Sequence, residues 1–421
     1  MGRLSRLLSV RSTAAGRLAI GTGGGHIGVL IGTPFLTRLY GPATLGSYFL
    51  LLGYALLIAN TGSLRYDLAI PLVPRTQLRS AILLPVTCCV AFALLLYVMA
   101  FVIDPIWFAR SLGFGSGGSA WQGMFLLAPV EVARIGTRLA ILRENEFSVA
   151  AREASFGQIG RVAGQVVCGF FAPSLVALVA IDLISRALVV LFMWGKLPSG
   201  TTKLTVVLSL ARKYARFPLF SAPATVLSSV SLQAPLFILG RLFGPVAVGW
   251  YGLVQRVAGA PTALLGRALM DVYMSRLAAM KRSEESNYLD LFGNTLRRGL
   301  KIALLGLAPL TLLMAQVLPL ALGKDWSQTR PMLTVLTPMY ALAFASVVVE
   351  PTLSVLERQD IHLKREAIRV ALVLGGLGVG ALMGRSTLWA ICGLSIGGTA
   401  SYVYYMVSGY QAVRQHGVGS S

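Results

Sequence analysis

The sequence predicts an all-α membrane protein of about twelve transmembrane helices, arranged as two six-helix lobes around a central cavity. Hydrophobic residues make up 55% of the 421 residues and charged residues only 13%, which is too apolar for a soluble domain. A motif running from Arg38 to Tyr48 also returns from Arg241 to Tyr251, with Arg, Leu, Gly, Pro, Gly and Tyr in register. This repeat indicates that one bundle of membrane helices occurs twice.

Apolar stretches of about 20 residues, the length that crosses a bilayer, recur along the chain. We place spans at residues 18–36, 45–64, 80–103, 121–142, 155–172, 174–194, 217–240, 246–274, 302–322, 332–353, 370–384 and 387–408. If the two motif copies face the same side of the membrane, an even number of spans must separate them, and six spans fit. Such parallel repeats are related by an axis along the membrane normal.

The widest break between spans divides the chain near its middle and predicts the domain boundaries. It contains Pro198, Ser199 and Gly200, followed by an amphipathic stretch, as expected of a linker. We therefore expect an N-terminal lobe over residues 1–195, a cytoplasmic linker over 196–216 and a C-terminal lobe over 217–421.

The net charge of +21 would suggest nucleic acid as a partner of a soluble protein, but its distribution indicates membrane orientation instead. With the N-terminus inside, most Lys and Arg residues fall in cytoplasmic ends and loops, and few fall in outer loops. The positive-inside rule then places both termini in the cytoplasm and removes the need for a nucleic-acid partner. The apolar run after the basic N-terminus continues to Leu36, which predicts a first span and not a signal peptide.

Neither a metal, a cofactor nor a disulfide is expected. Cys88, Cys89, Cys168 and Cys392 all lie inside apolar spans. Gly23 to Gly28 matches a dinucleotide-binding fingerprint, but no strand precedes it. The first span instead carries glycines at three- and four-residue spacing, which predicts close helix packing. These glycines are Gly21, Gly24, Gly25, Gly28 and Gly32.

Ionisable residues within spans are the candidate site, because each one facing lipid would cost about 2.5–3.5 kcal/mol. Glu131, Arg134 and Arg138 share one face of the fourth span at i, i+3 and i+7 spacing. Arg161 lies on a polar stripe of the fifth span. Asp182 and Arg186 can pair at i and i+4 on the sixth, and a self-neutralising pair is the simpler interpretation there.

Two arginines of the eighth span, Arg256 and Arg267, share a face with Asp271. No acidic residue lies three or four positions from Arg256, which favours a functional interpretation for it. Arg65 and Asp67, at the inner end of the second span, form either a cavity rim or an interfacial pair. Because the planar guanidinium fork suits phosphate, we expect an anionic cargo.

The candidates fall into two sets. The candidate substrate contacts are Arg65, Arg134, Arg138, Arg161, Arg256 and Arg267. The candidate ion-coupling residues are His26, Glu131, Asp182, Asp271 and Glu350. For His26, a core imidazole satisfied by a neighbouring helix is the main alternative. In the seventh span, Pro218, Pro223 and Pro235 predict a broken helix that could act as a hinge.

Several stretches, in this order and spacing, resemble the Wzx-type oligosaccharide flippases of the multidrug/oligosaccharidyl-lipid/polysaccharide exporter superfamily. They are Arg38 to Gly46, Leu64 to Pro71, Arg143 to Ala151, Tyr214 to Pro218, Gly240 to Pro261 and Gly323 to Trp326. The resemblance implies a flippase, not an enzyme, for undecaprenyl-diphosphate-linked oligosaccharide units in the bacterial cytoplasmic membrane, serving O-antigen, capsule or exopolysaccharide assembly. It also implies Arg256 and Arg65 as contacts for the diphosphate or an anionic sugar, and a polysaccharide polymerase and chain-length regulator as protein partners.

The chain departs from related peptidoglycan-precursor flippases, which have two more spans and a sodium-linked acid in the seventh. No Asp or Glu lies between Phe217 and Gly240, so proton coupling and the membrane potential stay open as drives. A multidrug or cation antiporter of the same superfamily is the nearest alternative, but it should carry acids where this chain carries arginines. A membrane-bound polymerase would need catalytic groups in a large outer loop, and the segment from Asp104 to Ala120 offers no acid–base pair.

Overall fold

The computed structural model describes residues 14–114, 119–200, 202–261, 265–283, 287–356 and 358–418. All regular structure within these ranges is helical, which confirms the predicted fold class. The chain divides into two compact units, Met1–Gly249 and Trp250–Ser421, so the division falls near the end of the second motif copy. The lobe boundaries expected from the sequence, 1–195 and 217–421 with a linker between them, stay a prediction.

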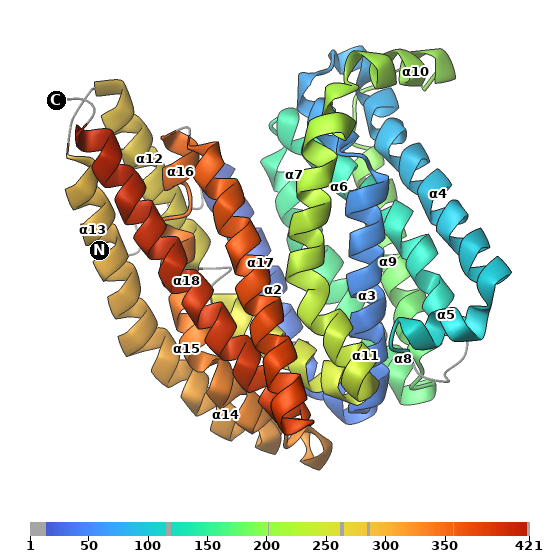
Figure 1. The fold of residues 1–421 in the computed structure, drawn as a ribbon. Coiled ribbons are helices and arrows are strands. Elements are labelled where there is room, and N and C mark those ends of the chain that lie inside the picture. Colours follow the sequence, from blue (N-terminus) through green and yellow to red (C-terminus); the bar gives the residue numbers. More distant parts are fainter. Residues whose placement is uncertain are drawn as a thin grey trace, which may run out of the picture. The chain divides into compact units, whose positions relative to one another are not determined.

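The first unit consists of long helices that run alongside one another, with short helices at their ends (Figure 1). The helix α10 lies crosswise at one end and contacts α4, as its amphipathic sequence suggests. The elements of this unit are α2 (Ala14–Leu39), α3 (Pro42–Gly62), η1 (Tyr66–Leu72), η2 (Arg75–Gln77), α4 (Leu78–Ile103), α5 (Pro105–Ser111), η3 (Ser119–Gln122), α6 (Gly123–Arg143), α7 (Phe147–Arg152), η4 (Glu153–Gly157), α8 (Gln158–Phe171), α9 (Leu175–Trp194), α10 (Leu204–Lys213), η5 (Phe217–Ser221) and the first part of α11 (Ala222–Pro261).

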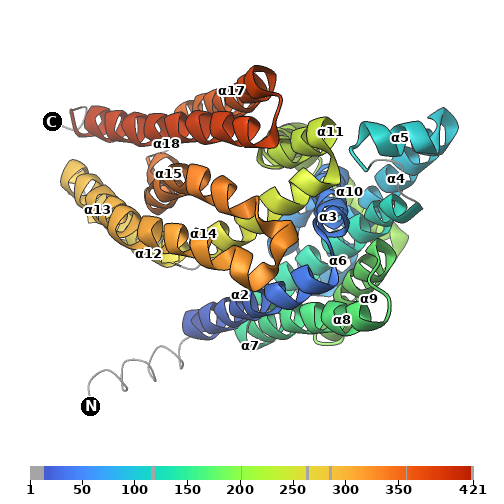
Figure 2. The same cartoon turned by 90° about the horizontal axis from the view of Figure 1, so that it is seen from below.

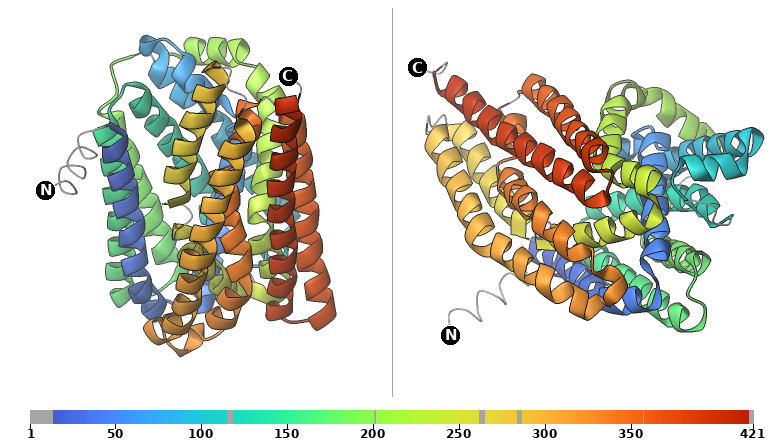
Figure 3. Two further views of the ribbon diagram at one scale, coloured as in Figure 1. Left: turned by 90° about the vertical axis from the view of Figure 1, so that its left-hand side faces the viewer. Right: turned by 60° about the horizontal axis from the view of Figure 1, so that its bottom comes forward.

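The second unit contains the end of α11 and a set of helices of which the last two, α17 and α18, lie side by side (Figures 2 and 3). Their backbones meet at glycines: a Cβ on Gly376 would lie 2.3 Å from the carbonyl oxygen of Gly393. The other elements are α12 (Arg267–Ser283), α13 (Tyr288–Ile302), η7 (Ala303–Leu307), α14 (Ala308–Leu322), η8 (Lys324–Trp326), α15 (Thr329–Val348) and α16 (Thr352–Val355), followed by α17 (Gln359–Gly384) and α18 (Thr387–Val418).

Eight helical stretches in the described part of the chain are long and apolar enough to cross a membrane. They are Pro42–Gly62, Arg75–Ile103, Leu175–Trp194, Leu232–Gly259, Tyr288–Leu322, Lys324–Val348, Lys364–Gly384 and Thr387–Gln415. The protein is therefore a multi-pass membrane protein. The predicted spans at α2, α6 and α8 lie outside this set, and the predicted spans 217–240 and 246–274 share the single stretch Leu232–Gly259, so the count of twelve stays a prediction. The helix α6 carries charged residues along its middle, and α8 is short.

The glycine stripe of α2 packs closely against α7, η4 and α8, which confirms the interpretation of this sequence as a packing surface. A Cβ on Gly25 would lie 2.2 Å from the carbonyl oxygen of Ala154, and a Cβ on Gly32 would lie 2.2 Å from a methyl carbon of Val162. Gly21 and Gly28 make similar approaches, whereas Gly24 has nothing within 4 Å of its Cβ position. Four of the five glycines thus form the contact.

In both copies of the repeated motif a regular helix starts at the proline that follows a glycine, and the two helix starts touch each other. In the first copy Pro42 is the first residue of α3, preceded by Gly41 in an extended conformation. In the second copy Gly244 has φ 78° and ψ −179°, and it breaks α11 directly before Pro245. A Cβ on Gly46 would lie 1.7 Å from the carbonyl oxygen of Pro245, and one on Gly249 would lie 2.2 Å from that of Pro42. The repeat therefore forms a reciprocal backbone contact.

The break in α11 lies at this glycine and not at the prolines of the predicted seventh span. Pro218 lies in the π-helical turn η5, and the only non-helical residue in α11 is Gly244. Pro235 lies inside the helix without interrupting it. A glycine with positive φ ends the regular helix more sharply than proline does, because proline retains a helical φ.

Candidate functional site

The candidate site is a cavity of about 280 Å³ inside the first unit, between α6, η4, α8 and α9, which we call the ionic cavity. Its walls carry charged side chains, and a charge taken out of water requires a partner. The lining residues are Glu131, Arg134, Arg138, Glu153, Gly157, Gln158, Arg161, Ser185, Arg186 and Val189.

The residues of α6 reach the ionic cavity because their spacing places them on one face of the helix. Glu131, Arg134 and Arg138 all line it, as the i, i+3 and i+7 spacing predicts. Glu153 reaches it from the π-helical turn η4, and its side chain is 5% exposed. Single π-helical turns inside α-helices occur often at functional sites.

Glu153 joins two arginines of α6. The Nη1 of Arg134 donates to one carboxylate oxygen of Glu153 at 2.6 Å, and Arg138 donates to the other. Arg134 also forms a bidentate pair with Glu131, at 2.7 and 2.9 Å. Two carboxylates therefore share the guanidinium of Arg134.

Asp182 joins two further arginines and is itself fully buried. The Nε of Arg186 donates to Asp182 at 3.0 Å, and the Nη1 of Arg161 donates to the same oxygen at 3.3 Å. Arg186 also pairs with Glu131 on α6, so the network is continuous. The i, i+4 pair expected on the sixth span is confirmed, and it is one part of a larger cluster.

The network holds four arginines, Arg134, Arg138, Arg161 and Arg186, against three carboxylates, which leaves one excess positive charge. Each arginine side chain is between 16% and 27% exposed, so part of each guanidinium faces the cavity. Charges taken out of water cost several kcal/mol each unless they are paired and hydrogen-bonded. The arrangement can accept an added anion more readily than an added cation.

The repeated motif supports the wall of the ionic cavity. The hydroxyl of Tyr40 donates to the carbonyl oxygen of Gln165 at 2.9 Å, and the side-chain nitrogen of Gln165 donates to the hydroxyl of Tyr48 at 2.9 Å. Both tyrosines lie in the first motif copy, and Gln165 is one turn beyond Arg161 on α8. These bonds fix α8 against the start of α3.

Arg65 and Asp67 form a separate pair, 3.3 Å apart, after the end of α3. Leu64 and Arg65 both have left-handed backbone conformations, with φ 50° and 59°. The Nε of Arg65 and the Oδ1 of Asp67 are buried without a hydrogen-bond partner. Burial raises the pKa of the Asp67 carboxyl, and Arg65 and a backbone hydrogen bond oppose this rise only in part.

The other predicted residues lie outside the ionic cavity. His26 is half-buried on α2, with its Nδ1 2.9 Å from the carbonyl oxygen of Thr22 on the same helix. Four belong to the second unit: Arg256 on α11, Arg267 and Asp271 on α12, and Glu350 after α15. Arg256 is half-buried and the other three are exposed. The expected shared face of Arg256 and Arg267 passes through residues 262–264, which lie outside the described residues.

Sequence reasoning missed Glu153 as a site residue, because the predicted fifth span begins two residues after it. Glu153 and Arg161 are eight residues apart, and a span begun earlier would have placed both on one face. Arg365 lies near a predicted cytoplasmic helix end, where a basic residue indicates only orientation, yet its side chain is buried at 1% exposure. Its Nη2 donates to the carbonyl oxygen of Tyr405 at 2.6 Å, and its guanidinium lies over the Tyr405 ring.

Comparison with known proteins gives one family and several similar folds. Residues 76–331 match the family described as polysaccharide biosynthesis protein. No match was found among curated proteins.

Three solved structures illustrate the fold. The lipid II flippase MurJ in an inward closed conformation has a TM-score of 0.73 and 11% identity, over 95% of this chain and 90% of that one. The Vibrio cholerae MATE transporter VcmN has a TM-score of 0.60 and 14% identity, over 99% of both chains. A MOP superfamily transporter from Pyrococcus furiosus has a TM-score of 0.59 and 16% identity, over 97% of this chain and 98% of that one. The family match agrees with the resemblance to polysaccharide flippases, and the solved structures show that this chain shares the fold of MurJ and the MATE transporters.

Proposed function

Because the chain belongs to the polysaccharide biosynthesis protein family, we propose that it is a flippase for undecaprenyl-diphosphate-linked oligosaccharide units. It would work in the bacterial cytoplasmic membrane, with both termini in the cytoplasm, during assembly of O-antigen, capsule or exopolysaccharide. A polysaccharide polymerase and a chain-length regulator are its expected partners. The observation that carries the proposal is the excess positive charge of the ionic cavity.

The ionic cavity suits a diphosphate for reasons of charge and geometry. A diphosphate in hydrocarbon would lose its hydration at a cost far beyond what a single contact restores. Guanidinium forks replace that hydration with charge-assisted, bidentate hydrogen bonds. Glu131, Glu153 and Asp182 occupy these forks in the structure, and a bound diphosphate would exchange with part of them. Arg65, Arg256 and Arg267 remain proposed contacts for other parts of the headgroup.

The transport cycle is proposed to be alternating access, in which the two lobes expose the headgroup first to the cytoplasm and then to the outer side. The polyprenyl chain stays on the lipid-facing side of the protein throughout and does not enter the ionic cavity. Glu131 and Asp182 are proposed as the residues that couple transport to an ion, because both form ion pairs with arginines that would bind the substrate. A change in their protonation would therefore change the affinity for the anion.

A cation antiporter of the same superfamily is the second candidate, and the fold it shares with the MATE transporters supports it. An antiporter for cations needs excess negative charge at its binding site, which the ionic cavity lacks. Uptake of a fluorescent cation into everted membrane vesicles separates the two functions.

The test is complementation of a flippase-null strain, with surface polysaccharide and lipid-linked intermediate both measured. Among the described residues, the Arg138 guanidinium pairs with Glu153 alone, so Arg138→Gln removes one pair while Glu153 keeps its bond to Arg134. Arg212→Gln, at an exposed position on α10, is the matched control. We expect the intact gene and the control to restore polymer, and Arg138→Gln to accumulate the lipid-linked unit. If the Arg138→Gln strain makes as much surface polysaccharide as the wild type at the same amount of membrane protein, the ionic cavity does not bind the substrate.

A further inference from the structure

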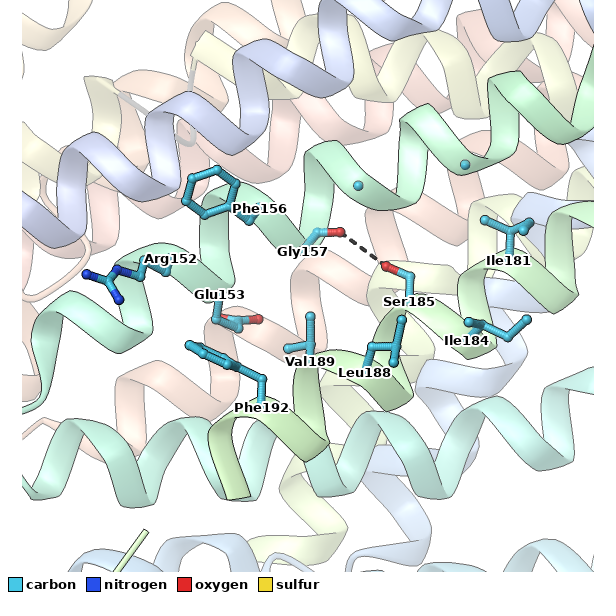
Figure 4. Close-up of a pocket in the computed structure, with 12 residues that line it drawn as sticks. Arg152, Glu153, Phe156, Gly157, Ile181, Ile184, Ser185, Leu188, Val189 and Phe192 are labelled. Carbon is cyan, nitrogen blue, oxygen red and sulfur yellow. Dashed lines mark hydrogen bonds between the residues drawn. The ribbon is translucent and has the colours of Figure 1, made fainter. Parts of the chain in front are cut away.

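A second cavity, of about 570 Å³, shares a wall with the ionic cavity and differs from it in chemistry. We call it the apolar groove. It runs between η4 and α8 on one side and α9 on the other, and the residues common to both cavities are Glu153, Gly157, Ser185 and Val189. Figure 4 shows Glu153 near Phe192 and Val189, with Leu188, Ile184 and Ile181 continuing along α9 away from it.

Apart from Arg152 and Glu153 at one end, the large side chains that line the apolar groove are apolar, and the protein leaves several of them uncovered (Figure 4). Phe156 is 71% exposed and Leu188 is 61% exposed, and Ile184 and Phe192 are also exposed. In a multi-pass membrane protein such side chains face hydrocarbon. The groove is therefore accessible to a lipid chain along its length.

Gly160 leaves the floor of the groove open, whereas a Cβ on Gly157 or Gly164 would lie 3.0 Å from a side-chain carbon of Val189 or Ile181 on α9. Gly157, Gly160 and Gly164 follow one another at three- and four-residue spacing along η4 and α8. A Cβ on Gly160 would have nothing within 4 Å, so no part of the chain fills the space above it. The hydroxyl of Ser185 donates to the carbonyl oxygen of Gly157 at 3.3 Å, which joins α9 to this floor (Figure 4).

We propose that the apolar groove holds the polyprenyl chain of the lipid-linked substrate while the diphosphate lies in the ionic cavity. The proposal rests on the proposed function. An amphiphile with an anionic head and a long apolar chain matches two adjoining cavities, one with excess positive charge and one apolar. Glu153 lies where they meet, so the head and chain of one molecule can occupy both.

We expect the groove to position the lipid substrate and to add little to its binding affinity. Lipid chains are as apolar as leucine, so moving a chain from the bilayer into the groove gains no hydrophobic free energy. The gain is in packing and in placing the diphosphate next to Arg134 and Arg138. Blocking the groove should therefore lower the rate of flipping several-fold while binding of a water-soluble diphosphate stays unchanged.

Photo-crosslinking in proteoliposomes tests the occupant directly. A benzophenone amino acid at Leu188 reports on the groove, and one at Leu191, exposed on the same helix but outside the groove, is the control. The probe is radiolabelled undecaprenyl diphosphate in phosphatidylglycerol and phosphatidylethanolamine vesicles. We expect a polyprenyl diphosphate adduct at Leu188 and phospholipid adducts alone at Leu191. Phospholipid alone at Leu188, or equal polyprenyl labelling at both positions, would overturn the proposal.

Filling the groove gives a second, independent measurement. Gly160→Leu places a side chain into the open floor, and Gly306→Leu adds one at another helical glycine with nothing within 4 Å. We expect Gly160→Leu to lose the adduct at Leu188 and to flip several-fold more slowly, with Gly306→Leu unchanged. If Gly160→Leu keeps the same adduct yield and the same flipping rate, the groove does not hold the polyprenyl chain. The proposed function would still stand in that case, provided that the wild type flips the lipid. Wild-type protein that does not flip the lipid would instead refute the proposed function, and this proposal with it.

Discussion

The contact between the two copies of the repeated motif predicts that Gly46→Ala destabilises the first unit. A Cβ at this position lies 1.7 Å from the carbonyl oxygen of Pro245 and 2.7 Å from the backbone nitrogen of Gly249. Ordinary van der Waals contact begins near 3.4 Å, and both neighbouring atoms belong to backbone. Rotation of a side chain cannot relieve the overlap, so one helix start has to move.

Overpacking of this kind costs about 1–3 kcal/mol in well-packed cores. For a unit of about 250 residues, each kcal/mol lowers the melting temperature by about 2–4 °C. Gly41→Ala is the matched control, because Gly41 lies in the same motif, has φ −65° and has nothing within 4 Å of its Cβ position. The melting temperatures of both variants are compared in detergent, by heating each sample and measuring the remaining folded protein by size-exclusion chromatography.

The reciprocal change extends this test. Gly249→Ala meets the carbonyl oxygen of Pro42 at 2.2 Å, so it should cost a similar amount. Both changes push the same two helix starts apart, and the double variant should therefore lose less than the sum of the single losses. Equal melting temperatures for Gly46→Ala and Gly41→Ala would refute the close contact.

Three further predictions concern charge and strain. Glu131→Ala removes one of the two carboxylates that each of Arg134 and Arg186 contacts and raises the excess positive charge of the network from one to two, which should cost about 3–5 kcal/mol. Glu350→Ala, at an exposed position, should change the melting temperature little. Burial raises the pKa of Asp67, so the folded state keeps this proton to higher pH than the unfolded chain. The melting temperature of the wild type should therefore fall relative to that of Asp67→Asn as the pH rises above the ordinary carboxyl pKa of about 3.9. Melting temperatures that change in parallel with pH in both proteins would contradict this. Leu64→Gly should melt at a higher temperature than Leu64→Ala, because a left-handed conformation costs a residue with a Cβ about 1–2 kcal/mol; the reverse order would show that no strain is stored there.

The sequence predicts helices and shared faces well where an α-helical period runs uninterrupted. Glu131, Arg134 and Arg138 lie within one regular helix, and all three line the ionic cavity as their spacing requires. The glycine spacing of α2 predicts its close packing for the same reason. Identical residues in register also identify the repeat, which the structure shows as two matching helix starts.

The sequence predicts contacts poorly where they join distant elements or depend on an irregular turn. The partners of Glu153 come from α6, nineteen and fifteen residues away, and Glu153 lies in a π-helical turn that no periodicity indicates. The break in α11 depends on a positive φ at Gly244, whereas proline content suggested earlier positions. Arg365 resembles any basic residue at a helix end until Tyr405 is seen to cover it.

The central claim, that the arginines of the ionic cavity carry an anionic lipid headgroup across the membrane, is tested most directly by flipping in proteoliposomes. Purified protein is reconstituted with an undecaprenyl diphosphate-linked sugar, and the fraction that reaches the outer leaflet is measured by accessibility to an added sugar-modifying enzyme. We predict rapid translocation by wild type and by Arg212→Gln, and strongly reduced translocation by Arg138→Gln with an unchanged melting temperature. Equal translocation by Arg138→Gln and wild type would contradict the account.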